Sequence, residues 1–176
     1  LDFATVHAAI YDAVQAYDGR FEPYAVKITG ASGSPVAATA KAAHDVLVNR
    51  FPAQSASLDT NYNAYLANHG LSQDDPGVSV GELAAAAIIA LRANDGSWPA
   101  NPQVFNGGTE PGEWRPTPPA FASMAVPWLG SVTPFTLKDP TQFRVNQPPP
   151  DLSSRKYAED YNEVKALGAL TNSART

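Results

Sequence analysis

The stretch VSVGELAAAAIIALRANDG, residues 78–96, decides the fold. Its apolar residues recur at the spacing of an α-helix, and Asp95-Gly96 marks its end. The stretch is apolar around most of its circumference, which is typical of a helix in a protein interior. We predict a helix from about Val78 to Asn94 whose small side chains permit close approach of its neighbours. The apolar stripe consists of Leu83, Ala84, Ala87, Ile88 and Leu91.

Three further helices are predicted before this stretch, each with apolar residues three or four positions apart. They cover about residues 2–17, 34–51 and 55–69, the last starting at either of two nearby serines. Ser34-Pro35 combines a capping hydroxyl with a proline that a first helical turn tolerates, and Gly70 supplies a left-handed cap. The expected buried faces are Val6, Ile10, Ala13, Val14 and Tyr17; Val36, Ala40, Ala43, Leu47 and Phe51; and Leu58, Tyr62, Tyr65 and Leu66.

The pattern changes in residues 97–151, which hold 12 of the 16 prolines and show no apolar periodicity. A structureless stretch of this length is usually a functional loop or a disordered linker. Disordered segments are poor in aromatic residues, whereas this one is rich in them. We therefore predict an ordered arm in which Trp114, Trp128 and Phe135 are largely buried. A fifth helix is predicted over residues 153–167, with a glycine as its stop.

Together these features predict an all-α fold, a bundle of about five helices with a long proline-rich irregular arm. Residues 1–176 are expected to form a single helical region, the amino-terminal part of a larger helical domain, with residues 97–152 as the covering arm. Leu1-Asp2-Phe3-Ala4 enters a helical pattern directly, and residues 171–176 resemble a helix start with nothing apolar after them. We expect a fragment, or one product of a nicked protein.

Composition excludes several classes of function. The formal net charge of -5, with no cluster of Lys and Arg, argues against a nucleic-acid surface. The absence of cysteine excludes disulfides, thiolate metal sites and cysteine nucleophiles. No stretch reaches the roughly 18 apolar residues of a membrane span, and no signal segment is present. We expect a soluble protein, with its localisation unknown and export left open.

The candidate chemical residues are better explained by structural roles. His7 and Asp12 are five apart on one helix, which is not the spacing that places two ligands on one face. The adjacent pair His44-Asp45 is expected to point in different directions, and His69 to lie near a helix carboxyl end. Ser32-Gly33-Ser34-Pro35 could attract an anion at a helix start, but a capped loop is the simpler interpretation. The carboxylates Asp74-Asp75, Glu159-Asp160 and Glu163 are assigned to a helix start and to surface pairs.

Three segments carry a resemblance to a known family. They are Val6-His7-Ala8-Ala9-Ile10-Tyr11-Asp12-Ala13-Val14, Leu91-Arg92-Ala93-Asn94-Asp95-Gly96, and the region from Pro111 to Gly168 with its Gly112-Glu113-Trp114-Arg115-Pro116 run. This combination resembles the amino-terminal half of bacterial vanadium-dependent haloperoxidase-like proteins, in the superfamily of the type 2 phosphatidic acid phosphatases. The resemblance covers most of the chain. It implies a larger helical protein in which this piece forms outer helices and a covering arm.

The motifs that hold the oxyanion in that family are missing here. The only Arg-Pro is Arg115-Pro116, and Gly108 stands where the family has lysine. The only Ser-Gly, Ser32-Gly33, is followed by serine and not histidine, and the position six after Arg155 is Tyr161, again not histidine. We therefore assign no catalytic, cofactor-binding or metal-ligating residue to this chain. Vanadate is a cofactor of the parent protein by resemblance alone.

The resemblance thus implies an amino-terminal scaffold whose parent oxidises halides with peroxide, this chain being inactive by itself. One alternative is a parent that is a phosphatase of the same superfamily, because clamps on a tetrahedral oxyanion serve both reactions. Another is a non-catalytic helical interaction module whose arm offers aromatic side chains to a partner. The expected partner is the missing carboxy-terminal half or a second copy in a homo-oligomer, with no nucleic acid and no membrane span. Halide preference and organism are not indicated.

Overall fold

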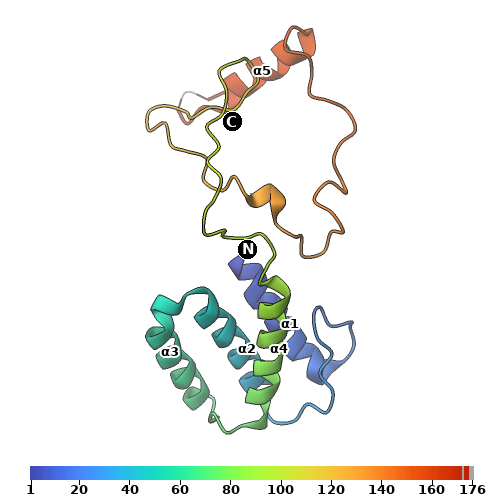
Figure 1. Ribbon diagram of the computed structural model, residues 1–176, viewed down its shortest axis with the longest axis vertical. Helices are drawn as coiled ribbons and strands as arrows, with labels where there is room; N and C mark the ends of the chain where they lie inside the picture. The colour runs from blue at the N-terminus through green and yellow to red at the C-terminus, as the bar shows by residue number, and fades with distance from the viewer. Residues whose placement is uncertain (172, 175–176) are drawn as a thin grey trace. The chain divides into compact units, whose positions relative to one another are not determined.

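A computed structural model describes residues 1–171 and 173–174, and all regular structure in that part of the chain is helical (Figure 1). The expected all-α fold is confirmed. The chain divides into two compact units, Leu1–Ser97 and Trp98–Thr176. The first contains α1 (Asp2–Asp18), α2 (Pro35–Arg50), the short 3-10 helix η1 (Pro52–Gln54), α3 (Ser55–Asn68) and α4 (Pro76–Arg92). The second contains η2 (Leu129–Ser131) and α5 (Arg155–Leu167). The helix start expected at 171–176 falls partly outside the described residues.

The helices begin and end at residues that the sequence marks. The Ser34 hydroxyl accepts hydrogen bonds from the amides of Val36 and Ala37 at 3.2 and 3.4 Å, which starts α2. Asp75 accepts from the Gly77 amide at 2.8 Å and starts α4. Gly19, at φ +63°, ends α1 in the left-handed conformation that favours glycine. The predicted limits of all five helices therefore agree with the structure to within about two residues, the usual uncertainty of such limits.

Polar contacts at the helix ends fix the directions of α1, α2 and α4. One carboxylate oxygen of Asp75 accepts from both the Ser34 amide and the Gly77 amide, each at 2.8 Å, so α2 and α4 start side by side. The opposite end of α2 meets the start of α1 through Arg50 and Asp2, whose Nε and Oδ1 are 2.6 Å apart. Helix α1 therefore runs antiparallel to α2 and α4. These three helices enclose the main core, formed by Ala9, Ala13, Ala38, Ala42, Val46, Val80, Ala84, Ala85 and Ile88.

Small residues bring α2 and α4 into close contact. A Cβ atom added to Gly77 would lie 2.2 Å from the Ser34 carbonyl oxygen, and one added to Gly81 would lie 2.3 Å from that of Ala38. The predicted close approach of the fourth helix is therefore present. It occurs at the glycines one and two turns before the alanine run that suggested it, although Ala84 and Ala85 are also buried.

The buried faces agree only in part with the predicted ones, because Ala13, Tyr62, Leu66, Ala84 and Ile88 are buried as expected but several larger residues are not. In α2 the interior residues are Ala37, Ala38, Ala42 and Val46, whereas Val36 and Phe51 are more than a third exposed. In α4, Leu83 and Leu91 point outward and are 56% and 53% exposed. The reason is steric, since backbones this close leave room for alanine and glycine but not for leucine. The larger side chains are therefore turned outward, some of them toward α3.

Helix α3 lies on the outer side of α2. Its residues Tyr62 and Leu66 are buried against Ala37 of α2 and Val78 of α4, in a small core of their own. The Leu71 amide donates to the Leu66 carbonyl at 2.9 Å and turns the chain toward α4. Elsewhere α3 contacts α2 and η1, and much of its surface is exposed.

The second unit is an irregular arm followed by α5. Its aromatic rings pair with each other, Trp98 with Trp128 at 5.0 Å and Phe105 with Trp114 at 5.6 Å between centroids. Trp114 remains 38% exposed and Trp128 and Phe135 are half-buried, which is less burial than the sequence suggested. The Ser154 hydroxyl starts α5 by accepting from the Tyr157 amide at 3.1 Å. Among the described residues, no helix has the length and apolar character needed to cross a bilayer.

Candidate functional site

The first unit has a groove of about 480 Å³ between α2 and α3. We call it the α2–α3 groove. Ile10 of α1 forms part of its wall, and apolar side chains dominate its lining. Among the residues that were expected in the core, Ala43, Leu47 and Tyr65 line the groove. The remaining lining residues are Thr39, Ala40, His44, Leu58, Asn61 and Tyr62.

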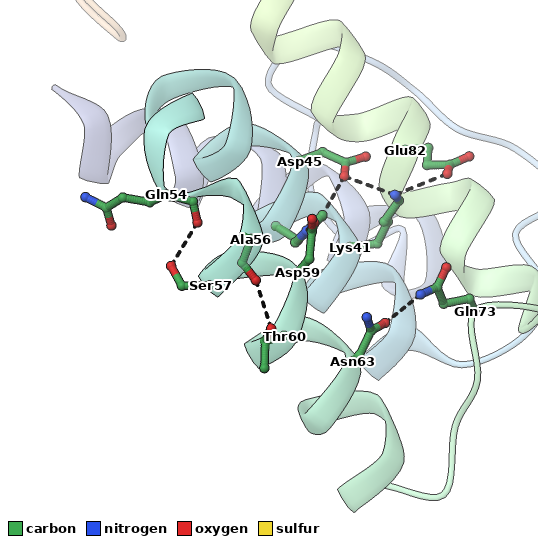
Figure 2. A network of polar contacts seen from close by, with 11 residues as sticks. Lys41, Asp45, Gln54, Ala56, Ser57, Asp59, Thr60, Asn63, Gln73 and Glu82 are labelled. Carbon is green, nitrogen blue, oxygen red and sulfur yellow. Dashed lines mark hydrogen bonds and ion pairs between the residues drawn. The ribbon is translucent and has the colours of Figure 1, made fainter.

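A polar network spans the edge of this groove and connects three helices (Figure 2). The His44 ring contacts Asp45 through Nδ1 and Asp59 of α3 through Nε2, each at 2.8 Å. Asp45 Oδ1 also lies 3.0 Å from Lys41 Nζ, and Lys41 lies 3.3 Å from Glu82 Oε1 of α4. The expectation that His44 and Asp45 point in different directions is therefore wrong, because the side chains of these adjacent residues turn toward each other.

The network shifts the pKa values of two of its neighbours. Burial opposes the charge on Lys41, but its contacts with Asp45 and Glu82 outweigh that penalty and raise the pKa of its ammonium group. The pKa of the Tyr62 hydroxyl is also raised. Burial is the main cause, the positive charge of Lys41 opposes it, and the carboxylates Asp45 and Glu82 add to it. Lys41 therefore stays charged, and Tyr62 stays neutral, at any pH near neutrality.

His44 is consequently held in place and not available as a base. Its ring stacks on Tyr62 with centroids 4.6 Å apart, and both of its nitrogens face carboxylate oxygens. A general base must offer a free nitrogen to the proton it removes. The arrangement joins α2 to α3, and among the described residues it presents no pair of nucleophile and base to the groove.

A second, polar cavity of about 270 Å³ lies where α1 begins and α4 ends. Two arginines line it, together with Thr5, Asn49 and Ser97. Arg50 contacts Asp2 at 2.6 Å and Arg92 contacts Asp95 at 2.6 Å, the latter pair with both side chains only 6% exposed. Burial would raise the pKa of Asp95. Hydrogen bonds from the hydroxyl and amide of Ser97, with the charge of Arg92, lower it below its ordinary value of 3.8.

Two arginines line this cavity, but it does not fit an oxyanion such as vanadate. A tetrahedral oxyanion needs several uncompensated positive or N–H donors. Here Arg50 and Arg92 each face a carboxylate, so the net charge of the four groups is zero. An anion entering the cavity would also approach Asp2 and Asp95, which repel it.

Two of the segments quoted for the resemblance, residues 6–14 and 91–96, lie in α1 and at the end of α4, and these two helices pack against each other. Thr5, one residue before the first, shares the polar cavity with Arg92 and Asp95 of the second. In the first, Asp12 is 1% exposed and accepts hydrogen bonds from the amides of Tyr24, Ala25 and Val26 at 2.6, 2.8 and 3.1 Å. Asp12 therefore fixes the loop that follows α1 against that helix, and Asp95 fixes the turn that follows α4, which are structural roles.

The other residues singled out by the sequence have local roles. His7 stacks on Phe3 at 4.2 Å and is exposed. His69 follows α3, and its Nδ1 lies 2.8 Å from the Tyr65 carbonyl, as expected for a histidine at a helix carboxyl end. Gly33 lies so close to Asp75 that this carboxylate occupies the place an anion would take at Ser32-Gly33-Ser34-Pro35, and the capped-loop interpretation is confirmed.

The surface carboxylates of α5 pair one turn along the helix. Glu159 contacts Arg155 at 2.7 Å and Asp160 contacts Lys156 at 2.6 Å. They form exposed ion pairs, which contribute little to stability.

Sequence reasoning missed the roles of Lys41, Asp59 and Asp12. Lys41 is four residues before Asp45, a spacing that predicts an ion pair on one helix face. The contact of His44 with Asp59 joins two helices, and no spacing within one helix could have indicated it. One feature of the sequence could have indicated the burial of Asp12, namely a carboxylate placed between the apolar residues Tyr11 and Ala13. These assignments rest on the geometry of this chain, since comparison with known protein families, curated proteins and solved structures finds no match.

Proposed function

We propose that this chain is the amino-terminal helical scaffold of a vanadium-dependent haloperoxidase-like enzyme, with the vanadate site outside the chain. The observation that carries the proposal is the adjacency of two of the segments that resemble the family. Residues 6–14 lie in α1 and residues 91–96 at the end of α4, two helices that pack against each other although they are far apart in sequence. Thr5, the residue before the first segment, lines the polar cavity together with Arg92 and Asp95 of the second. Their charged residues Asp12, Arg92 and Asp95 are buried.

A scaffold differs from an active site in what its buried charges contact. In this chain they contact backbone amides and each other, within α1, α4 and the loops that follow them. The parent enzyme would supply vanadate-binding residues elsewhere and use peroxide to oxidise a halide. The role of this chain would be to hold outer helices and an arm in place around that site.

The test is vanadate-dependent halide oxidation by the polypeptide encoded by the complete open reading frame. Purified protein is loaded with orthovanadate and supplied with peroxide and bromide, and halogenation of a dye is followed. The matched control is the 176-residue chain treated identically, for which we expect no activity and no tight binding of vanadate in calorimetry at low salt. A reading frame that ends at Thr176, or a longer protein without this activity, would overturn the proposal.

The same protein sample distinguishes the haloperoxidase proposal from the phosphatase alternative. A phosphatase of the superfamily would hydrolyse p-nitrophenyl phosphate without peroxide, and vanadate would inhibit it as a mimic of phosphate. Hydrolysis without halide oxidation would therefore assign the scaffold to a phosphatase parent.

A non-catalytic interaction module is the second candidate function, and one observation favours it. Several apolar side chains of the second unit are largely exposed: Val104, Phe121, Phe143, Val145 and Val164 are each at least 64% exposed. Exposed aromatic and aliphatic residues at this density are typical of surfaces that contact another protein. Under this alternative the chain would bind a partner without any downstream catalytic segment. Its test is whether Phe121→Gln with Phe143→Gln abolishes, in the 176-residue chain, a complex with a second copy that sedimentation detects and that Leu83→Gln with Leu91→Gln leaves intact.

A further inference from the structure

The asparagines of the arm, residues 97–152, differ in the residue that follows each of them. Asn101 precedes a proline, Asn106 precedes Gly107, and Asn146 precedes a glutamine, and all three asparagines are exposed. An asparagine side chain can form a five-membered ring with the backbone nitrogen of the next residue. The reaction needs an N–H group there, which proline lacks, and it is hindered by a side chain there, which glycine lacks. Both conditions are met at Asn106.

The structure leaves the two reacting groups accessible. Within the described part of the chain, no group forms a hydrogen bond with the Asn106 side-chain amide, and the Gly107 N–H donates to no acceptor. The next amide along, that of Gly108, does donate, to the Trp114 carbonyl at 3.0 Å. A hydrogen bond at either reacting group would have to open first, which would slow the reaction up to about tenfold.

The fold requires glycine at position 107. Its φ is +73°, in the left-handed region that favours glycine. A Cβ atom at this position would also lie 2.2 Å from the Trp114 carbonyl oxygen. The turn therefore keeps the residue that follows Asn106 free of the side chain that would hinder ring formation.

Two aspartates also precede glycines, and the structure protects both of them from the same ring closure. The Gly19 amide, which would attack Asp18, donates to the Gln15 carbonyl at 2.9 Å. Asp95 is 8% exposed, and its carboxylate lies 2.6 Å from Arg92. Asn106 differs from both sites in having an exposed side chain and a neighbouring amide that is not engaged.

We propose that Asn106 is a site of spontaneous deamidation through a cyclic imide. The Gly107 nitrogen loses its proton to a base in solution and bonds to Asn106 Cγ, and the bond from Cγ to Nδ2 breaks as ammonia leaves. Water then opens the ring at one of its two carbonyl carbons. Attack at Cγ gives aspartate, whereas attack at the main-chain carbonyl carbon gives isoaspartate, in which the backbone runs through Cγ. Either product carries one more negative charge than the parent chain.

The experiment incubates the full 176-residue chain at neutral pH, folded in buffer and unfolded in urea, and follows each asparagine by peptide mapping with mass spectrometry. Deamidation adds about 1 Da, because a carboxylic acid replaces the amide. Synthetic peptides serve as chromatographic standards for aspartate and isoaspartate. Circular dichroism shows that the folded sample keeps its helices. In that sample we expect Asn106 to react at a rate within about tenfold of its rate in urea, with isoaspartate among the products.

Asn106→Gln is the variant that tests the mechanism, because the longer side chain would have to close a six-membered ring, which forms far more slowly. We expect no acidic product at that peptide. The matched control is Asn101→Gln, in the same arm but before a proline, which should leave the reaction at Asn106 unchanged. Raising the pH should speed the reaction, because base removes the Gly107 amide proton.

Three results would overturn the proposal. One is a rate at Asn106 that is more than about tenfold lower in the folded chain than in urea, since that is the mark of protected groups. Another is a product that is aspartate alone, which would exclude the cyclic imide. The third is reaction at Asn101 or Asn146 as fast as at Asn106, which would show that neither the following glycine nor its amide determines the site.

Discussion

Gly81 of α4 lies against the backbone of Ala38 in α2, so closely that a methyl group on the glycine would be 2.3 Å from the Ala38 carbonyl oxygen. The same methyl group would lie 2.7 Å from Lys41 Cβ and 2.9 Å from the Ala42 amide nitrogen. Two of these three neighbours are backbone atoms, which cannot rotate away. The spacing of α2 and α4 is therefore set by the absence of a side chain at one position.

Replacing Gly81 by alanine should destabilise the first unit although alanine is the better helix former. The gain in helix propensity is about 1 kcal/mol, whereas forcing α2 and α4 apart costs about 1 to 3 kcal/mol and disturbs every pair along the interface. We expect a net decrease in the free energy of unfolding, measured by urea unfolding followed by circular dichroism. Ser79→Ala on the exposed face of α4 is the control and should be neutral or slightly stabilising. A Gly81→Ala protein as stable as the parent would show that the helices can separate without cost.

Asp12→Asn should release the loop that follows α1. The carboxylate accepts from three consecutive amides, and an asparagine side chain would place an N–H group against at least one of them. We expect a loss of about 2 kcal/mol, typical of hydrogen bonds to a charged group, and faster hydrogen exchange at residues 24–26. The exposed carboxylate of Asp18, changed to asparagine in the same way, should alter neither quantity. Unchanged protection of those amides in Asp12→Asn would contradict the assigned role.

Asp95 should make the first unit sensitive to acid. Its pKa is lowered in the folded protein, so the carboxylate contributes stability above the ordinary aspartate value of 3.8, and that contribution is lost as the pH falls through the folded-state pKa. Asp95→Asn leaves Arg92 beside a neutral group and should cost on the order of 3 kcal/mol at pH 7. The difference in stability between the parent and this variant should shrink as the pH is lowered toward 3. A difference that is constant with pH would show that the ion pair is not the cause.

The outward face of α4 should mediate association of the isolated chain. Leu83 and Leu91, 56% and 53% exposed, lie two turns apart on one side of the helix. A specific contact that covers this face should bury more than about 1,000 Å². We expect the chain to self-associate in sedimentation and to bind a hydrophobic dye, and the double change Leu83→Gln with Leu91→Gln to reduce both. Leu170→Gln, at a residue that is 96% exposed, should have no such effect. A dye-free monomer at high concentration would remove the reason to expect a partner.

Helix positions could be predicted from the sequence, but the orientation of the helices could not. Ser34-Pro35, Gly19 and Gly70 act locally, through hydrogen bonds and backbone angles within a few residues, so their effect is visible in the sequence itself. The direction in which a helix faces depends on its neighbours. Hydrophobicity alone would bury Leu47 and Leu83, yet Ala38 and Gly81 take the interior because they fit the narrow space between two backbones.

The candidate site was less predictable for the same reason. The pairing of Lys41 with Asp45 follows from their spacing on one helix. The contact of His44 with Asp59 and the bonds from Asp12 to the amides of residues 24–26 depend on how separate segments pack. A single sequence contains no measure of that packing, so the polar groups that join helices became apparent in three dimensions.

The shared cap at Asp75 has a mechanical consequence. Its Oδ1 atom accepts from the Ser34 amide and from the Gly77 amide at the same distance, so the starts of α2 and α4 are bonded to one atom. Sliding either helix along its axis by one residue, about 1.5 Å, would break one of the two bonds. The shared cap therefore opposes sliding of the two helices along each other. A displacement of α3 relative to α2 and α4 would then require changes in the backbone torsion angles of its two flanking connections, residues 51–54 and 69–75.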